Sequence, residues 1–228
     1  MAFRRDHTKV PRNASALDRA GPGREALRMD RIILLHGLGR GPVTMWPMGL
    51  ALRRAGFQTL AIGYPSRRGT IAGLTAGIAQ RLPAEGVLGF VGHSLGGVLA
   101  KRLMRGLPPE RRGRIVQLGS PNAGSALAGR LRVLEPVMGP VMAELEPGAI
   151  PDDGDLEIGA IAGTAALAAY GRITGIAGLN DGKVTVRSAW GSAPEGRRIA
   201  LPVAHATMML DPRVIKATVR FMQTGRFD

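Results

Sequence analysis

The chain has 228 residues, of which 45% are apolar and 4% aromatic, and it contains no cysteine. This length is enough for one well-buried core, and the lack of cysteine excludes disulfides and thiolate metal sites. The net charge of +14 raises nucleic acid and anionic membranes as partners, but only four of the 31 basic residues are lysine and the arginines are scattered. We therefore expect no specific nucleic-acid partner and only a weak association with anionic surfaces.

Residues 1–30 carry seven basic and four acidic residues without helical or strand periodicity. This composition predicts a disordered polar arm. The arm lacks the apolar core of a secretory signal, and no stretch of the chain reaches the roughly 18–20 apolar residues that a membrane-spanning helix needs. These features predict a cytoplasmic location.

Short apolar strands alternate with helical patterns after the arm. The expected elements are a strand at 31–35, a helix at 44–55, a strand at 58–62, a helix at 71–82, a strand at 87–91, a helix beginning before 98, a strand at 114–118, a helical insert at 125–148, strands at 156–162 and 199–203, and a closing helix from 212 to 222. Such alternation predicts an α/β fold: a small doubly wound, mainly parallel sheet of about six strands with helices on both faces. Residues 31–228 are expected to form this one domain.

The segment Gly92-His93-Ser94-Leu95-Gly96 lies between an apolar strand and a helical pattern. A serine on so abrupt a strand-to-helix turn has a strained backbone that presents its hydroxyl outward. Glycines two residues to either side are needed because a Cβ there would collide where strand and helix cross. In this context the G-x-S-x-G pattern predicts a nucleophile elbow, with Ser94 as the nucleophile of a serine hydrolase.

A serine hydroxyl needs a base to take its proton and a carboxylate to orient that base. Of the four histidines, His7 lies in the arm, and His36 and His93 belong to glycine loops that we expect them to shape. His205 remains, between the last strand and the last helix. Catalytic groups gather at such carboxyl-end loops of a doubly wound sheet, so His205 is the predicted base.

The carboxylate is expected between the serine and the histidine in chain order. Asp181, in the turn Asn180-Asp181-Gly182-Lys183-Val184, is the preferred candidate. Asp152, Asp153 and Asp155 are the rival group, although their clustering beside a proline suits a solvated turn. Their spacing does not match a calcium-binding loop and their ligand set is incomplete, so we expect no metal site.

The developing oxyanion needs aimed N–H donors. The amide of Leu95, at the start of the elbow helix, gains from the positive helix end. The second donor is expected in the loop after the first strand, with Leu38 preferred and Gly39 next. Further substrate contacts are expected from His36, Gly37, His93, Met138 and Met142. The insert at 125–148 follows a sheet strand, which would let it roof the site.

Four motifs together resemble the α/β-hydrolase superfamily, in the order found in small bacterial lipases and esterases. They are His36-Gly37-Leu38-Gly39, Gly92-His93-Ser94-Leu95-Gly96-Gly97, Leu118-Gly119-Ser120-Pro121-Asn122-Ala123-Gly124-Ser125 and Asn180-Asp181-Gly182-Lys183-Val184. The resemblance covers about residues 31–227. It implies that Ser94 is the nucleophile, His205 the general base and acid and Asp181 its orienting group, and that the Gly-Ser-Pro-Asn segment lines the floor of the site. Residues 163–180 show no pattern of the family.

The expected function is hydrolysis of carboxylic esters, small-molecule or lipid, through an acyl-enzyme and without a cofactor. Two alternatives stay open. The same triad could transfer the acyl group to another alcohol or cleave an amide. The chain could instead be a non-catalytic binding protein of this fold that docks on anionic lipid or nucleic acid.

Overall fold

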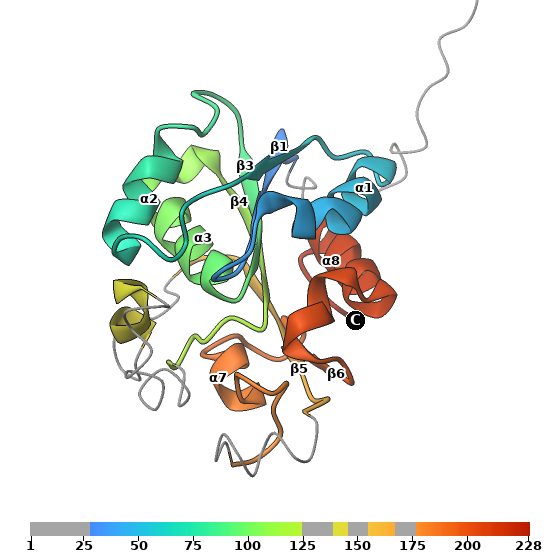
Figure 1. Cartoon of the computed structure of the whole chain (residues 1–228). Coiled ribbons are helices and arrows are strands. Elements are labelled where there is room, and N and C mark those ends of the chain that lie inside the picture. The colour runs from blue at the N-terminus through green and yellow to red at the C-terminus, as the bar shows by residue number, and fades with distance from the viewer. Residues whose placement is uncertain (1–27, 125–138, 146–154, 167–176) are drawn as a thin grey trace, which may run out of the picture.

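A computed structural model describes residues 28–124, 139–145, 155–166 and 177–228 of the chain (Figure 1). Its centre is one six-stranded sheet in which every neighbouring pair of strands is parallel. The strands are β1 (Arg31–Leu35), β2 (Thr59–Ile62), β3 (Leu88–His93), β4 (Arg112–Leu118), β5 (Ile158–Gly163) and β6 (Arg198–Leu201), in the order β2-β1-β3-β4-β5-β6. The predicted α/β fold class with about six mainly parallel strands is confirmed.

Helices connect these strands. They are η1 (Pro42–Met45), α1 (Trp46–Arg54), α2 (Ile71–Ala79), α3 (Leu95–Gly106), η2 (Pro109–Arg111), η4 (Pro140–Leu145), α7 (Val186–Trp190), η5 (His205–Leu210) and α8 (Pro212–Thr224). Figure 1 shows α2 and α3 on one side of the sheet and α1 and α8 on the other. Among the described residues, no helix combines the length and the apolar character that crossing a bilayer requires.

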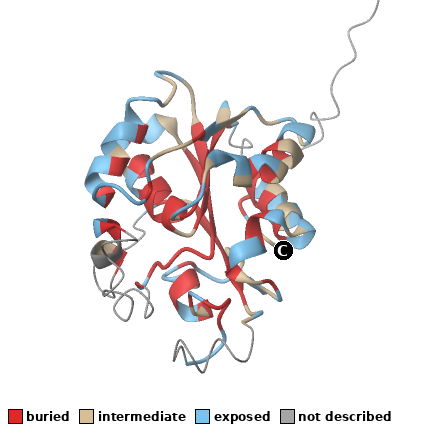
Figure 2. Ribbon diagram, in the orientation of Figure 1, coloured by how far each residue is buried: buried red, intermediate tan, exposed pale blue. Residues whose placement is uncertain are grey.

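The side chains of β1 show how the sheet is covered on both faces. Ile33 and Leu35 pack into the core with α2 and α3, whereas Ile32 and Leu34 pack with α1 and α8. All four are buried, as Figure 2 shows for the central strands of the sheet. Because successive strand residues point to opposite faces, an unbroken apolar strand requires helices on both.

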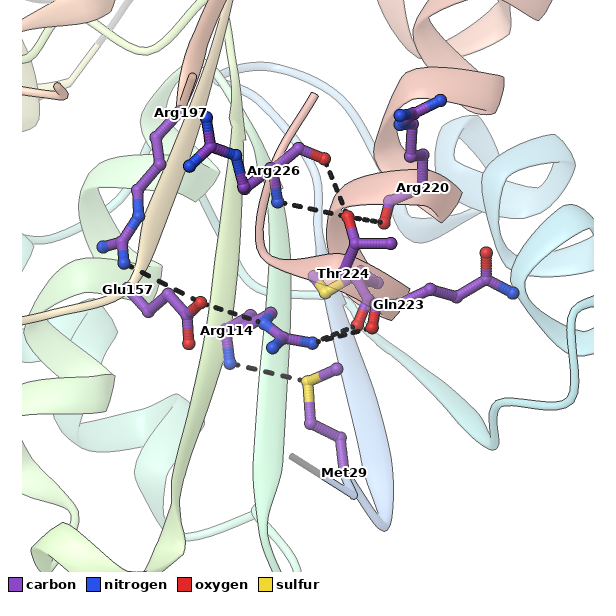
Figure 3. A network of polar contacts seen from close by, with 9 residues as sticks. Met29, Arg114, Glu157, Arg197, Arg220, Gln223, Thr224 and Arg226 are labelled. Atoms are coloured by element: carbon purple, nitrogen blue, oxygen red, sulfur yellow. Dashed lines mark hydrogen bonds and ion pairs between the residues drawn. The ribbon is translucent and has the colours of Figure 1, made fainter. Parts of the chain in front are cut away.

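Arg114 fastens the end of α8 to the middle of the sheet (Figure 3). From β4 its Nη1 donates to the carbonyl oxygens of Met222 at 2.9 Å and Gln223 at 3.2 Å, in the last turn of α8. Its Nε lies 3.2 Å from a carboxylate oxygen of Glu157. The last carbonyls of a helix have no partner within the helix, so this buried guanidinium supplies one.

The structure differs from the expected elements in two places, and a further expected element is described only in part. The helix expected at 44–55 is divided into η1 and α1, because Pro47 lies in the first turn of α1 and favours a new helix start there. The short helix α7 was not predicted. Of the insert expected at 125–148, only the turn 139–145 lies within the described residues, and most of the predicted arm lies outside them.

The sheet order fixes where a site can form. The chain leaves β1 toward β2 on one side and reaches β3 on the other, so the order reverses between β1 and β3. In open α/β sheets, a crevice at the carboxyl ends of the strands at such a point is the usual place for a ligand. The glycine-rich loop 36–41 after β1 and Ser94 after β3 border this point.

Candidate active site

Ser94 occupies a strained backbone position between β3 and α3. Its φ of 53° is the only positive φ of a non-glycine residue in the described part of the chain. A Cβ at Gly92 would lie 2.4 Å from the backbone of Gly96, and one at Gly96 would lie 2.3 Å from the carbonyl oxygen of Leu35. These contacts bear out the steric reason expected for both glycines. Backbone strain of this kind is maintained only where the surrounding structure enforces it.

Asp181 and His205 form a buried pair. The Nδ1 of His205 lies 2.7 Å from Oδ2 of Asp181, and the backbone N–H of His205 donates to the carbonyl oxygen of Asp181 at 2.9 Å. The other carboxylate oxygen of Asp181 accepts from the amides of Lys183 and Val184 at 2.9 and 2.8 Å. Because a carboxylate only accepts, Nδ1 of the neutral ring carries the proton and Nε2 is left as its basic nitrogen.

Two glycines at the ends of strands leave the space that the Asp181–His205 pair occupies. A Cβ on Gly119, the residue after β4, would lie 2.9 Å from Oδ2 of Asp181 and 3.2 Å from Nδ1 of His205. A Cβ on Gly163, the last residue of β5, would lie 2.7 Å from Cβ of Asp181. The turn with Asp181 therefore folds back onto the carboxyl ends of β4 and β5, although 16 residues lie between Gly163 and Asn180 in the sequence.

The elbow and the Asp181–His205 pair are neighbours. The amide of Ser94 donates to the carbonyl oxygen of Leu118 at 2.9 Å, and Gly119, against which the imidazole of His205 lies, is the next residue. Among the hydrogen bonds of the described residues, none joins the Ser94 hydroxyl to His205. Bonds of this type are often long without substrate and shorten when it binds.

His93 connects the elbow to the histidine loop. Its Nε2 lies 3.0 Å from the carbonyl oxygen of His205, which can only accept, so Nε2 carries the proton. Its Nδ1 is buried without a hydrogen-bond partner among the described residues and faces Gly37. Burial, reinforced by the neighbouring His205, lowers the pKa of His93 well below its ordinary value. The ring is therefore neutral.

His36 shapes the loop after β1. Its Nε2 accepts from the amide of Tyr64 at 3.3 Å and its Nδ1 donates to the carbonyl oxygen of Gly37 at 2.9 Å. The Tyr64 ring stacks on His36 with centroids 4.1 Å apart, and the Tyr64 hydroxyl donates to the His36 carbonyl oxygen. Burial lowers the pKa of His36 and raises that of Tyr64, so both rings are neutral.

The amides of Leu38 and Leu95, the preferred oxyanion donors, differ from that of Gly39, the alternative, in whether they already donate a hydrogen bond. The amide of Gly39 donates to Oγ of Ser66 at 2.9 Å and is therefore occupied. Among the backbone hydrogen bonds of the described loops and helix ends, none is donated by the amide of Leu38 or of Leu95. Leu95 is the first residue of α3, where amide groups have no partner within the helix.

The other sequence candidates are less closely placed or lie outside the described residues. A Cβ on Gly37 would lie 2.7 Å from Nδ1 of His93 and 3.4 Å from Cβ of Ser94, so the loop touches the elbow. Met138, Asp152, Asp153 and the side chain of Met142 are not described. Within the described residues, no three His, Asp or Glu side chains are grouped so that they could hold a metal ion.

The resemblance placed Gly119 in a segment expected to line the floor of the site, but the contact of Gly119 with Asp181 and His205 was not foreseen. Sequence reasoning also missed the roles of Gly163 and Tyr64 and the contact from His93 to the His205 backbone. Only the glycines carried a signal. Each lies at or directly after the end of an apolar strand, and a glycine at the carboxyl edge of a parallel sheet often marks a close approach of another segment.

Known structures share this architecture, although no family model matches the chain. A metagenomic carboxyl esterase has a TM-score of 0.60 and 20% identity, over 86% of this chain and 71% of that chain. A pyrethroid hydrolase has a TM-score of 0.58 and 17% identity, over 86% of this chain and 98% of that chain. An extracellular α/β-hydrolase from a Paenibacillus species has a TM-score of 0.55 and 13% identity, over 85% of this chain and 98% of that chain. The chain has the α/β-hydrolase fold. Its structural neighbours in this fold are mostly esterases and other hydrolases.

One relative with a similar sequence is a dehydrogenase and not a hydrolase. The chain is 35% identical over 133 residues to a shikimate dehydrogenase (NADP(+)) from Streptomyces avermitilis, and the match covers 54% of this chain and 46% of that protein. Dinucleotide-binding sheets typically have the order 3-2-1-4-5-6 and a G-x-G-x-x-G turn that opens a helix. This α/β-hydrolase fold has the order 2-1-3-4-5-6, and Pro42 stands where that turn needs its third glycine.

Proposed function

We propose that this protein is a serine hydrolase that cleaves carboxylic esters through an acyl-enzyme. The observation that carries the proposal is the buried Asp181–His205 pair, packed against Gly119 at the end of β4, one strand from the strained Ser94. A nucleophile, a base and a group that orients the base are the parts that such chemistry requires.

In the first half of the reaction, Ser94 Oγ attacks the ester carbonyl carbon while Nε2 of His205 takes the hydroxyl proton. The carbonyl oxygen becomes an oxyanion and accepts hydrogen bonds from the amides of Leu95 and Leu38. Asp181 keeps the proton on Nδ1 and stabilises the imidazolium. The tetrahedral intermediate then expels the alcohol, which takes the proton from Nε2, and the acyl group stays on Ser94.

In the second half, His205 removes a proton from a water molecule, whose oxygen attacks the acyl carbon. The resulting intermediate releases the carboxylic acid, and the Ser94 oxygen recovers its proton from Nε2. The Ser94 proton leaves on the alcohol and is replaced by a proton from the water, so Ser94 and His205 end the cycle in their starting protonation states. Small-molecule and lipid esters are the substrate class that we propose, in line with the esterases among the structural neighbours.

A fluorophosphonate probe together with p-nitrophenyl esters of rising acyl length tests the proposal. We expect the natural chain to be labelled once and to hydrolyse esters, and Ser94→Ala to lose both while its circular dichroism spectrum is unchanged. Ser192→Ala is the matched control, because Ser192 is an exposed serine in the turn after α7, outside the proposed site. Full residual activity in Ser94→Ala would falsify the mechanism.

The binding-only alternative is also tested by the probe. The lack of a Ser94–His205 hydrogen bond within the described residues is the observation that favours it. An intact chain that the probe does not label and that hydrolyses no ester would support binding without catalysis. Acyl transfer and amide cleavage are separated from hydrolysis by product analysis with competing alcohols and with amide substrates.

A further inference from the structure

An exposed apolar strip lies on η1, α1 and η5. Four large apolar side chains stand out as exposed among the described residues, and three of them are here: Val43 at 77%, Trp46 at 60% and Leu210 at 49%. Val43 and Trp46 are three residues apart in consecutive helical turns. Leu210 ends η5, which packs against both η1 and α1. Exposed apolar side chains gathered on elements that pack together make a candidate interaction surface, whereas single ones are ordinary surface.

The strip continues into a groove between α1 and α8, the two helices that lie side by side on one face of the sheet (Figure 1). The groove has a volume of about 610 Å³. Trp46 and Leu50 of α1 line one wall, and Ile215 and Val219 of α8 line the other.

The rim of this groove is cationic. Arg54, Lys216 and Arg220 line it, and none of its lining residues is acidic. The sequences of α1 and α8 contain five basic residues and no acidic one. Arg54 and Lys216 are exposed and belong to no hydrogen bond or ion pair of the described residues. An exposed tryptophan and apolar groove surrounded by such cations form an amphipathic surface.

We propose that this surface, made of Val43, Trp46, Leu210 and the α1–α8 groove, docks on an anionic lipid bilayer. Tryptophan favours the boundary between headgroups and acyl chains, and nearby arginine and lysine side chains are attracted to anionic headgroups. A bilayer offers both components in one plane, which matches apolar side chains with cations around them. The proposal concerns binding and does not depend on the reaction at Ser94.

Other occupants fit this surface less well. A second copy of the chain placed face to face would set Arg54, Lys216 and Arg220 against their own equivalents. Residues 1–27 are also basic, with six basic and three acidic residues, so their charge does not complement the groove. Nucleic acid would satisfy the cations and leave Val43 and Leu210 without an apolar partner.

Docking at this surface would bring the candidate active site close to the lipid. Leu210 belongs to η5, which begins at His205, and Val43 belongs to η1, directly after the glycine loop with Leu38. The docked face and the candidate active site therefore share the loops that follow β1 and β6.

The test measures binding of the full chain to vesicles of phosphatidylglycerol and phosphatidylcholine and to vesicles of phosphatidylcholine alone. Ser94→Ala is used as background so that no lipid is consumed. Arg54→Glu with Lys216→Glu reverses two charges of the groove. The matched control is Arg68→Glu with Arg102→Glu, which reverses two exposed charges next to α2 and on α3, across the sheet.

We expect binding to the anionic vesicles only, and a blue shift of tryptophan fluorescence that Trp46→Phe abolishes. The groove charge variant is expected to lower the partition coefficient about tenfold to a hundredfold, and the control pair much less. Trp46→Ala is also expected to weaken binding, because it removes the side chain that enters the boundary.

Four results would overturn the proposal. Equal losses in the two charge variants would mean that net charge alone, including that of residues 1–27, causes adsorption. Binding without a Trp46 blue shift would mean that the apolar strip does not enter the lipid. Equally tight binding of polyglutamate at this face would indicate an acidic protein partner, and a Trp46-dependent dimer in sedimentation would indicate a second copy.

Discussion

His93 Nε2 donates to the carbonyl oxygen of His205 across 3.0 Å, and the two rings pack with their centroids 4.9 Å apart. Ser94 follows His93 directly in the sequence. The bond therefore links the residue before the proposed nucleophile to the backbone of the proposed base. Both of its atoms are buried. In this arrangement His93 is a positioning residue, because it acts through His205 and is itself buried.

Replacing His93 by leucine removes this donor and fills its buried place with an apolar side chain. We expect kcat for a p-nitrophenyl ester to fall about tenfold to a hundredfold with little change in KM, because a displacement of about 1 Å can cost that much. His93→Gln can again present an N–H and should recover part of kcat. Equal kcat values for the two variants, at equal thermal midpoints, would contradict the positioning role.

The buried neutral histidines make stability depend on pH. Burial lowers the pKa values of His93 and His36 below the ordinary histidine value of 6.5. Below about pH 6.5 the unfolded chain binds protons that the native chain does not, so stability falls as the pH decreases. We expect the free energy of unfolding to drop by up to about 1.4 kcal/mol per pH unit for each histidine. Urea titrations between pH 7.5 and 5.5 measure the slope, and His93→Leu should make it shallower.

Asp181 and Asp155, one of its three rivals in the sequence, can be distinguished by matched substitutions. Asp181→Asn removes the charge that orients the His205 ring, and we expect kcat to fall roughly 10³–10⁴-fold. Asp155→Asn is the control, because Asp155 is exposed and its ion pair with Arg112 spans 3.8 Å. If Asp155→Asn lost activity and Asp181→Asn kept it, the assignment of the carboxylate would be wrong.

Gly119 is expected to tolerate no side chain. Its φ of 57° is unfavourable for other residues, and a Cβ would press on both Asp181 and His205. We expect Gly119→Ala to lower kcat by roughly a hundredfold. Gly77→Ala on α2 is the control, since a Cβ there meets nothing within 4 Å, and it should stabilise the fold by up to about 1 kcal/mol.

Arg114 is expected to matter for stability rather than for activity. Arg114→Met leaves the α8 carbonyl oxygens of Met222 and Gln223 without their donor and Glu157 without its nearest cation. A loss of about 2–3 kcal/mol in the free energy of unfolding is expected from these unpaired groups. Chemical denaturation measures this loss, with the exposed Arg102→Met as reference. Unchanged stability would mean that solvent replaces the contacts.

The strands and the elbow could be predicted from the sequence because their signals are local. Apolar runs such as 32–35 and the glycines around Ser94 reflect packing and steric conditions within one short segment. The same holds for the start of α8, where Asp211 accepts from the amide of Arg213. Propensity and periodicity capture such conditions.

The expected boundaries were less accurate where a weaker local signal competed with the apolar pattern. The helix α1 begins at Trp46, with Pro47 in its first turn, and this is later than the continuous pattern 44–55 suggested. The helix α7 has five residues, fewer than two turns, so its period could not be recognised.

The sequence by itself determined the alternation of strands and helices, the parallel sheet and the position of the elbow, because each depends on neighbours along the chain. Only the tertiary structure decided that Asp181 folds back over Gly163 to meet His205, that His93 holds the His205 backbone, and that Val43, Trp46 and Leu210 form one exposed strip. These pairings join residues far apart in sequence, and the free energy that favours them comes from packing and hydrogen bonds that exist only once the sheet has formed.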